Sequence, residues 1–248
     1  VFFICGLWAF AVNWIGFIPA NIYKTEKFYD LVGAFTNLTT VLIAAILSQP
    51  LSIRAILVTL FVSIWALRLG TYLFKRISAD GGDKRFNDIK IYPLRFLNAW
   101  QLQGLWIILT TACAVAIITS GNQSPLDIFA YVGIALWVIG FAIEVIADNQ
   151  KKAFRAKSEN KGRFIQSGLW SWSRHPNYFG EVLFWLSIFL FAYSADTGYA
   201  WTAVGVVAMF ILFWFGGNNP HAIAQGDTLV VGIYHNPPFV IQTEDNDF

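Results

Sequence analysis

Apolar and polar residues alternate along this chain in long blocks rather than in short periods. Seven blocks are apolar and long enough to form membrane-spanning helices, each of which needs about 20 residues. We place them at residues 1–20, 31–48, 52–74, 99–120, 127–147, 180–195 and 198–217, of which the sixth is the shortest. Polar segments such as Gln49-Pro50 have the composition of turns and separate neighbouring blocks. The pattern predicts an all-α, multi-pass transmembrane helical bundle of about seven helices.

Composition supports a membrane protein and excludes several other classes. Only 13% of the 248 residues are charged, about half the fraction found in soluble domains. The net charge of +2 gives no basis for binding nucleic acid. The two cysteines, Cys5 and Cys113, lie in apolar blocks, without the spacing of a metal site or a disulfide framework. No G-x-G-x-x-G sequence follows a predicted strand, so we expect no Rossmann domain. We also expect no metal site and no obligate protein partner.

Basic residues gather in three loops that seven crossings would place on one face of the membrane. The first loop carries Lys24 and Lys27, and the others are residues 75–98 and 148–179. The loops of the opposite face carry only Arg54. By the positive-inside rule, the three basic loops are cytoplasmic and the N-terminus is outside.

The greatest variety of chemical groups lies in residues 168–181, which end in Arg174-His175-Pro176-Asn177-Tyr178-Phe179-Gly180-Glu181. Pro176 fixes its own backbone and disfavours helix at His175, so a non-helical approach to the next helix is predicted. A cationic segment that opens onto a helix N-terminus suits an anion. A plain loop among lipid headgroups would explain Arg174 and the tryptophans, but not this mixture of groups. We therefore expect a ligand site.

Two further polar features lie in or beside apolar blocks. Arg68 is inside the third block, where it would either bind a carboxylate or extend to the cytoplasmic end of a tilted helix. Glu144, Asp148 and Arg155 fall within roughly 40° of one another if the fifth helix continues. Two carboxylates and a guanidinium on one stripe suit ribose hydroxyls and a phosphate. A plain polar helix end would explain the adjacent lysines, but not Glu144, which lies a turn deeper.

Residues 218–248 differ in composition from the rest of the chain. The run 227–239 resembles the first strand and ligand loop of a periplasmic solute-binding protein, but it is too short to fold as that domain. Such a domain belongs outside the cell, whereas the predicted topology places this segment in the cytoplasm. We divide the chain into a transmembrane bundle, residues 1–217, and an atypical tail, residues 218–248, which is foreign or truncated and has no assigned function.

Several short motifs between about Tyr29 and Gly217 together resemble one family. They are Phe28–Gly33, Arg68-Leu69-Gly70, Asp83–Phe86, Trp100–Gly104, Glu144–Arg155 and Ser173–Glu181. In this combination the chain resembles the steroid 5α-reductase-like membrane family, in particular its bacterial DUF1295-type branch. Members are seven-helix reductases that use NADPH to reduce a carbon–carbon double bond conjugated to a carbonyl in a lipid. The resemblance therefore implies a reductase of a lipid or steroid-like enone, in a bacterial inner membrane.

The resemblance also implies roles for individual residues. Glu144 departs from the family, because steroid-reducing members carry an amide there, and Trp65 replaces the tyrosine that holds the steroid carbonyl. Positions that would bind NADPH are Arg68, Tyr72, Glu144, Asp148, Arg155, Asn177 and Glu181, with Arg174 and His175 as further groups suited to its negative charges.

The catalytic positions are less closely defined. Tyr29 and Asp30 fall in the region of the family's catalytic Gln–Glu pair. Hydride addition to an enone leaves charge on the carbonyl oxygen, so a hydrogen-bond donor must already face it. Tyr29, a protonated Asp30 or Tyr178 could provide that donor.

Two other functions stay open at this point. Arg174-His175-Pro176-Asn177-Tyr178 also fits the Arg-His-Pro-x-Tyr motif of membrane methyltransferases of the isoprenylcysteine type. Their cofactor, S-adenosylmethionine, carries a sulfonium cation that would favour Glu144 and Glu181. The third possibility is a non-catalytic lipid-binding membrane protein. The asparagine after the proline and the acid–Asp–Arg spacing favour the reductase.

Overall fold

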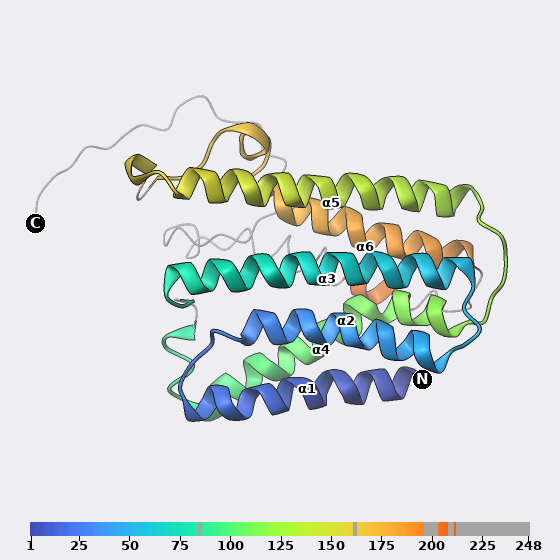
Figure 1. Ribbon diagram of the computed structural model, residues 1–248, viewed down its shortest axis with the longest axis horizontal. Coiled ribbons are helices and arrows are strands. Elements are labelled where there is room, and N and C mark those ends of the chain that lie inside the picture. The colour runs from blue at the N-terminus through green and yellow to red at the C-terminus, as the bar shows by residue number, and fades with distance from the viewer. Residues whose placement is uncertain (84–85, 161–162, 196–202, 208–210, 212–248) are drawn as a thin grey trace, which may run out of the picture.

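Six long α-helices run side by side in the computed structural model, which describes residues 1–83, 86–160, 163–195, 203–207 and 211 (Figure 1). They are α1 (Phe2–Ile22), α2 (Tyr29–Leu47), α3 (Ile53–Asp80), α4 (Pro93–Thr119), α5 (Ile128–Arg155) and α6 (Pro176–Ser194). Two short 3₁₀ turns, η2 (Ser158–Asn160) and η3 (Gly168–Ser171), lie between α5 and α6. The described residues contain no strand, and the predicted all-α class is confirmed.

The helices have the lengths and surfaces of membrane-spanning segments. Five of them, α1 to α5, are long and apolar enough to cross a bilayer. Large apolar side chains such as Phe3, Ile15 and Ile46 are mostly exposed on them, as expected where lipid rather than water surrounds the protein. The protein is therefore a multi-pass membrane protein. The seventh predicted crossing, apart from residues 203–207 and 211, and the predicted tail lie outside the described residues.

Four helices extend by at least one helical turn beyond the apolar blocks that predicted them. α3 ends at Asp80 rather than residue 74, and α5 at Arg155 rather than residue 147. A 28-residue helix is about 42 Å long, whereas the hydrocarbon layer is about 30 Å thick, so the last turns can be polar. α4 and α6 begin earlier than predicted, at Pro93 and Pro176, because proline at the first helical position lacks only an N–H that would be unpaired anyway. These polar extensions carry much of the site described below.

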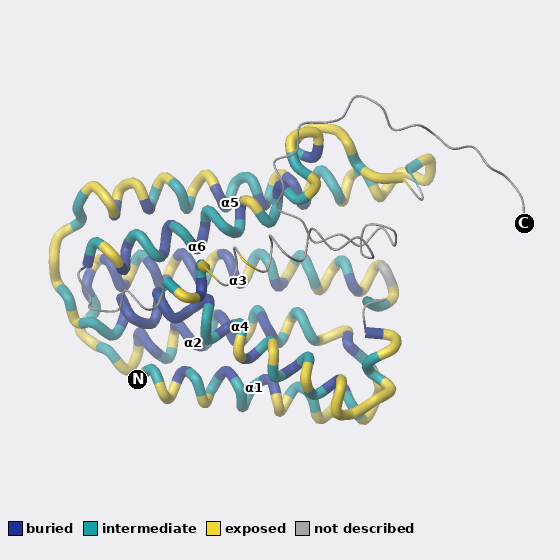
Figure 2. The backbone as a smooth tube through the Cα atoms, turned by 180° about the vertical axis from the view of Figure 1, so that it is seen from behind, coloured by how far each residue is buried: buried dark blue, intermediate teal, exposed yellow. Residues whose placement is uncertain are grey.

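The bundle is built around the close pairing of α5 with α6. A Cβ added to Gly180 would lie 2.5 Å from the carbonyl oxygen of Gly140 and 2.8 Å from the backbone nitrogen of Glu144. Only glycine permits this approach of the two backbones. α3 lies beside this pair, and α2, α4 and α1 follow in turn (Figure 1). Buried positions concentrate between the helices, and exposed positions follow their outer faces (Figure 2).

The loops predicted to be basic all lie at one end of the bundle. The connections 23–28, 81–92 and 156–175 are on the left in Figure 1, and connections 48–52 and 120–127 are at the opposite end. At that opposite end, Arg54 is buried and donates hydrogen bonds to the carbonyl oxygens of Ser124 and Pro125 and to Ser194 Oγ. Arg54 thereby ties the start of α3 to the 120–127 loop and to the end of α6.

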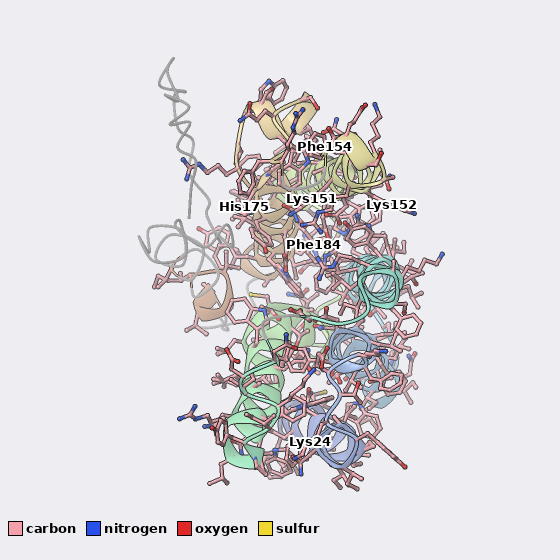
Figure 3. The ribbon with its side chains drawn as sticks, turned by 90° about the vertical axis from the view of Figure 1, so that its left-hand side faces the viewer. Lys24, Lys151, Lys152, Phe154, His175 and Phe184 are labelled. Atoms are coloured by element: carbon pink, nitrogen blue, oxygen red, sulfur yellow. The ribbon has the colours of Figure 1, made fainter. Side chains whose placement is uncertain are left out.

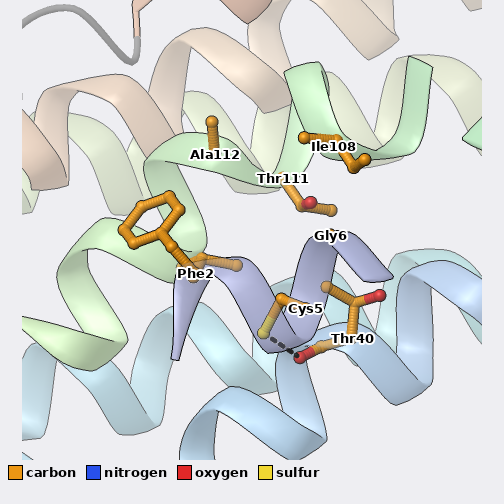
Figure 4. Close-up of a pocket in the computed structure, with 8 residues that line it drawn as sticks. Phe2, Cys5, Gly6, Thr40, Ile108, Thr111 and Ala112 are labelled. Carbon is orange, nitrogen blue, oxygen red and sulfur yellow. Dashed lines mark hydrogen bonds between the residues drawn. The ribbon is translucent and has the colours of Figure 1, made fainter. Parts of the chain in front are cut away.

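A small cavity near the N-terminus lies between α1, α2 and α4 (Figure 4). Its volume of ≈ 20 Å³ is enough for about one water molecule. Cys5, Thr40 and Thr111 contribute polar atoms to its wall, and the Cys5 thiol lies 3.8 Å from the Thr40 carbonyl oxygen. The cavity is too small for a lipid substrate or a dinucleotide.

Candidate functional site

Arg68 lies at the centre of a buried polar cluster between α3, α5 and α6. Its Nη1 donates to Glu144 Oε1 at 2.7 Å, and its Nη2 donates to Asp148 Oδ2 at 2.6 Å. A longer bond of 3.3 Å joins Nη2 to the Glu144 carbonyl oxygen. The Arg68 side chain is 17% exposed, and the two acidic side chains are 3% and 4% exposed. Of the two alternatives left open for Arg68, the structure shows the carboxylate partner, and there are two of them.

Helix geometry explains why one guanidinium reaches both acids. Glu144 and Asp148 are four residues apart on α5, so their side chains project from the same face. The predicted stripe therefore exists, because α5 stays helical as far as Arg155. The planar fork of an arginine can bond two carboxylates at once, which a lysine cannot do in the same geometry.

α6 completes the cluster from its first turns. Pro176 is the first helical residue and His175 precedes it with non-helical angles of φ −142° and ψ 64°, so the predicted non-helical approach is confirmed. Asn177 Nδ2 donates to Asp148 Oδ1 at 3.3 Å. Glu181 follows Gly180, at the point where α6 touches the Glu144 backbone, and its charge acts on Glu144. The structure thus brings Asn177 and Glu181 to Arg68 from a separate part of the sequence.

Aromatic rings border the cluster on two sides. The Arg68 guanidinium lies 5.2 Å from the centre of the Tyr72 ring, one helical turn further along α3. On the deeper side, the Trp65 ring lies 5.2 Å from both Phe184 and Trp185. Trp65 and Trp185 are buried, and their indole nitrogens have no hydrogen-bond partner within the described residues. Sequence reasoning took Trp65 only as a lost tyrosine and did not single out Trp185.

His175 contributes a neutral ring to this end of the bundle. It stacks on Tyr178 with ring centres 5.0 Å apart. Burial, together with the positive charges of Lys151 and Arg174, lowers the pKa of His175 to about 4. At neutral pH it therefore offers a neutral, hydrogen-bonding ring next to the exposed Arg174.

Further cations surround the outer end of the cluster. The charges of Arg76 and Arg155 act on Tyr72, and those of Arg76 and Lys151 act on Asp148. Arg155 is exposed and makes no ion pair within the described part of the chain. In Figure 3, Lys151 and His175 lie over α5 and α6, whereas Lys24 lies at the far side of the same end. Positive charge is thus present at the end of the bundle that lies nearest to Tyr72 and Asp148.

Tyr29 and Asp30, the other predicted catalytic residues, lie at the start of α2. The Tyr29 hydroxyl donates to the Ala99 carbonyl oxygen at 2.9 Å, and its ring packs against Phe86 and Trp100. Tyr29 therefore contacts the α4 side of the bundle. Asp30 lies 3.8 Å from Arg76, which is two turns beyond Arg68 on α3.

A buried carboxylate beside Tyr29 was not predicted. Glu26 is 3% exposed and accepts hydrogen bonds from Lys90 Nζ at 2.8 Å and from the Asp83 backbone N–H at 2.9 Å. Burial alone would raise the pKa of Glu26, but these two hydrogen bonds outweigh it and lower the pKa. Glu26 joins the α1–α2 loop to the α3–α4 loop. A single glutamate in a short loop carries no signal of this role in the sequence.

Comparison with known proteins identifies relatives but no mechanism. The chain is 27% identical over 198 residues to an uncharacterized protein of Schizosaccharomyces pombe. The matched region covers 66% of this chain and 56% of the yeast protein. The chain thus spans little more than half the length of that relative. No solved structure matches the chain. The family described as "protein of unknown function (DUF1295)" matches residues 16–223, and the chain therefore belongs to DUF1295, a steroid 5α-reductase-like family.

Proposed function

We propose that the protein is a membrane oxidoreductase that uses NADPH to reduce the conjugated carbon–carbon double bond of a lipid or steroid-like enone. The observation that supports this most is the buried cluster of Arg68, Glu144 and Asp148, to which α6 adds Asn177 and Glu181. These residues, with Tyr72, are positions that the family resemblance associates with the dinucleotide. Membership of a steroid 5α-reductase-like family supports the same conclusion.

The free polar atoms of the cluster fit a dinucleotide. Glu144 Oε2 and Asn177 Oδ1 are buried acceptors with no hydrogen-bond partner in the described residues. Ribose hydroxyls and a carboxamide would supply donors to them, and such unpaired buried acceptors are costly to leave empty. Arg155 and Arg174 would hold phosphates at the outer end. When bound, the dinucleotide supplies the hydride, and the protein contributes position, charge and exclusion of water.

The substrate carbonyl needs a hydrogen-bond donor near this cluster. Tyr178 follows Asn177 directly, so it lies in the helical turn that approaches Asp148. Tyr29 contacts the α4 side of the bundle, and Asp30 lies beside Arg76, further along α3 than Arg68. Of the three predicted donors, we therefore favour Tyr178, because its neighbour Asn177 binds Asp148 of the cluster.

Thermal unfolding of the purified protein with different cofactors tests the proposal. A ligand that binds only the folded state at about 100 times its Kd stabilises it by about 2.7 kcal/mol. We expect NADPH to raise the melting temperature, NADH to raise it less, and S-adenosylmethionine to leave it unchanged. A shift with S-adenosylmethionine alone would contradict the reductase.

One observation favours the methyltransferase as a second candidate. The cluster contains three carboxyl groups, on Glu144, Asp148 and Glu181, but only one interior guanidinium. An excess of negative charge suits a sulfonium cation. The same melting experiment separates the two cofactors.

We further propose that the basic end faces the cytoplasm of a bacterial cell, in the inner membrane. The positive-inside rule is the support, since connections 23–28, 81–92 and 156–175 lie together at that end. A cysteine introduced at Lys157 should be protected from a membrane-impermeant thiol reagent in intact cells, and one introduced at Gln123 should be labelled. The reverse pattern would invert the topology.

A further inference from the structure

Thr40 differs from the other threonines of the described helices in how its hydroxyl is bonded. Each of the others donates to the backbone carbonyl four residues earlier, a bond open to any threonine in a helix: Thr36, Thr39, Thr59, Thr71, Thr110, Thr111 and Thr119. Thr40 is 1% exposed, and its Oγ1 has no hydrogen-bond partner within the described residues. Because a buried hydroxyl is costly to leave unpaired, this one indicates a bound group.

Thr40 lines the small cavity between α1, α2 and α4, where Cys5 and Thr111 meet it from the other two helices (Figure 4). Thr111 is 1% exposed, and its hydroxyl donates to the Ile107 carbonyl oxygen at 2.6 Å. Cys5 is 4% exposed, and its thiol donates to the Thr40 carbonyl oxygen at 3.8 Å. Each of these two side chains has used its hydrogen atom and can only accept a further bond. The described wall thus combines one donor, on Thr40, with two acceptors.

The size and chemistry of the cavity select a water molecule. Its volume of ≈ 20 Å³ exceeds the roughly 10–15 Å³ that one water needs, and it excludes a lipid tail or headgroup. No charged side chain of the described residues lines it, so an ion would lack a counter-charge. A buried water usually makes about three hydrogen bonds to polar groups, and the donor and two acceptors of the wall provide them.

We propose that this cavity is a binding site for one ordered water molecule, which joins α1 to α2 and α4. The water accepts a hydrogen bond from the Thr40 hydroxyl and donates to the Thr111 hydroxyl oxygen, with the Cys5 sulfur as its third neighbour. The site lies between α1, α2 and α4, whereas the Arg68 cluster lies between α3, α5 and α6. It is therefore separate from the proposed cofactor site and does not depend on it.

The water adds a polar link to the helix with the least buried surface. In the most apolar part of α1, 17% of the residues are buried, compared with 61% in α4. Lipid competes with other helices for apolar contacts, so helices in a bilayer associate through close packing and polar contacts. Trp8 Nε1, one turn along α1 from Cys5, donates to Thr39 Oγ1 at 2.8 Å. The water completes a set of polar contacts that hold the first half of α1 against α2 and α4.

The sign of the change in melting temperature in Thr40→Val tests the site. Valine has the shape of threonine without its hydroxyl, so the substitution removes the donor that the described wall offers to the water. The loss of about one net hydrogen bond should lower the melting temperature in detergent by roughly 2–4 °C. If the cavity binds nothing, the same change removes an unpaired buried hydroxyl and should raise the melting temperature. An unchanged or raised melting temperature would therefore overturn the proposal.

Thr59→Val is the matched control for the general effect of replacing a buried threonine. Thr59 is 9% exposed on α3, and its hydroxyl donates to the Ala55 carbonyl oxygen rather than into the cavity. That carbonyl also accepts the backbone bond of the helix, so the melting temperature should fall less than in Thr40→Val. An equal or larger fall in Thr59→Val would show that the effect belongs to helical threonines in general, and would overturn the proposal.

An experimental density map at a resolution that shows ordered water gives the direct test. We expect one rounded peak within about 2.5–3.0 Å of both Thr40 Oγ1 and Thr111 Oγ1, and no such peak in Thr40→Val. Elongated density, as from detergent or an acyl chain, would overturn the assignment to water, and so would a wild-type cavity without density. None of these measurements involves a cofactor, so failure of the water site and failure of the proposed reductase are distinguishable.

Discussion

Arg54 and Arg68 lie about four turns apart on the same helix, and they show how differently one residue type can be used inside a membrane protein. Arg54 is fully buried and Arg68 largely so, with side chains 1% and 17% exposed. Arg54 is bound mainly by neutral groups, at 3.4 Å from the Ser124 carbonyl, 2.7 Å from the Pro125 carbonyl and 2.5 Å from Ser194 Oγ. Arg68 is bound by two carboxylates and a backbone carbonyl.

The two arginines differ in how many unused hydrogen-bonding groups remain on their partners. The carbonyls around Arg54 belong to a loop that this arginine closes, and its one acid, Asp127, is 42% exposed at 3.3 Å. The acids around Arg68 keep an unpaired oxygen, and their neighbours include unpaired indole donors. Burial alone therefore does not separate a structural arginine from a functional one. The spare hydrogen-bonding capacity of the partners does.

The largest expected effect is the loss of stability in Arg54→Ala. The substitution leaves the Pro125 carbonyl and Ser194 without their donor and frees the end of α6 from the 120–127 loop. Removing one partner of a buried charged network costs about 3–5 kcal/mol. The melting temperature in detergent measures it. In whatever fraction folds, the increase in melting temperature with NADPH should persist, and its selective loss would show that Arg54 also serves the ligand site.

Arg68→Met should destabilise the protein by about 3 kcal/mol at pH 8, which is similar to or less than the effect of Arg54→Ala. Unlike that effect, the destabilisation by Arg68→Met should decrease at lower pH. Glu144 and Asp148 lose their counter-charge, and they can relieve the cost by taking up protons as the pH falls. The difference in melting temperature from the wild type should therefore narrow between pH 8 and pH 5. Arg54→Ala is the matched control, because backbone carbonyls cannot be protonated in this range. A difference that stays constant for Arg68→Met would mean that the two arginines stabilise in the same way.

A smaller effect is expected in the pH dependence of stability, which should differ between the His175 end and the Arg54 end of the bundle. The folded-state pKa of His175, about 4, is below its unfolded value of about 6.5. Between these values only the unfolded chain binds the proton, so His175 stabilises fully above about pH 6.5 and the benefit falls as pH approaches 4. The full loss of stability is about 3 kcal/mol, at 1.36 kcal/mol per pKa unit. His175→Gln should flatten this part of the curve of melting temperature against pH.

The Arg54 end should not respond in that range. Burial slightly opposes ionisation of Asp127, but the Ala130 N–H and Arg54 outweigh it and lower its pKa. A carboxylate with a lowered pKa contributes stability above its unfolded value, about 3.9, and loses it only as the pH falls through the folded value. Asp127→Asn should therefore leave the slope between pH 6.5 and 4 intact. If melting temperature depended less on pH in Asp127→Asn, the acid response would arise at the Arg54 end and not at His175.

The sequence predicted the elements of the site better than their assembly. Arg68 and Glu144 were found because polar residues inside apolar blocks are unusual, and Asn177 because residues 168–181 combine many different chemical groups. Helical periodicity also placed Glu144 and Asp148 on one face correctly. What periodicity cannot give is which helix lies opposite that face. The Gly140–Gly180 contact decides this, and single glycines in apolar helices carry no pairing signal that can be read from one sequence.

Hydropathy was also the reason why other features were missed. It ends helices where polarity rises, so the polar last turns of α3 and α5 were cut short, although they carry Arg76 and Arg155. Glu26 and Lys90 come from two separate loops, and their contact depends on how α1 and α4 pack. Arg54 was seen only as a loop charge. Its partners are backbone carbonyls, which have no sequence signature.

The smallest expected effect on stability, and the most specific for binding, is that of Arg155→Ala. Arg155 is exposed at the end of α5 and has no ion pair within the described residues, so its loss should change stability by less than about 0.5 kcal/mol. A charge-assisted hydrogen bond to a phosphate contributes about 1.5–3 kcal/mol, which corresponds to a rise in the Kd for NADPH of roughly 10- to 150-fold. Lys157→Ala removes another exposed charge just beyond α5 and is the matched control. If both variants bind NADPH equally well, the outer cations serve only the membrane surface, and the spare capacity around Arg68 must serve a ligand without phosphates.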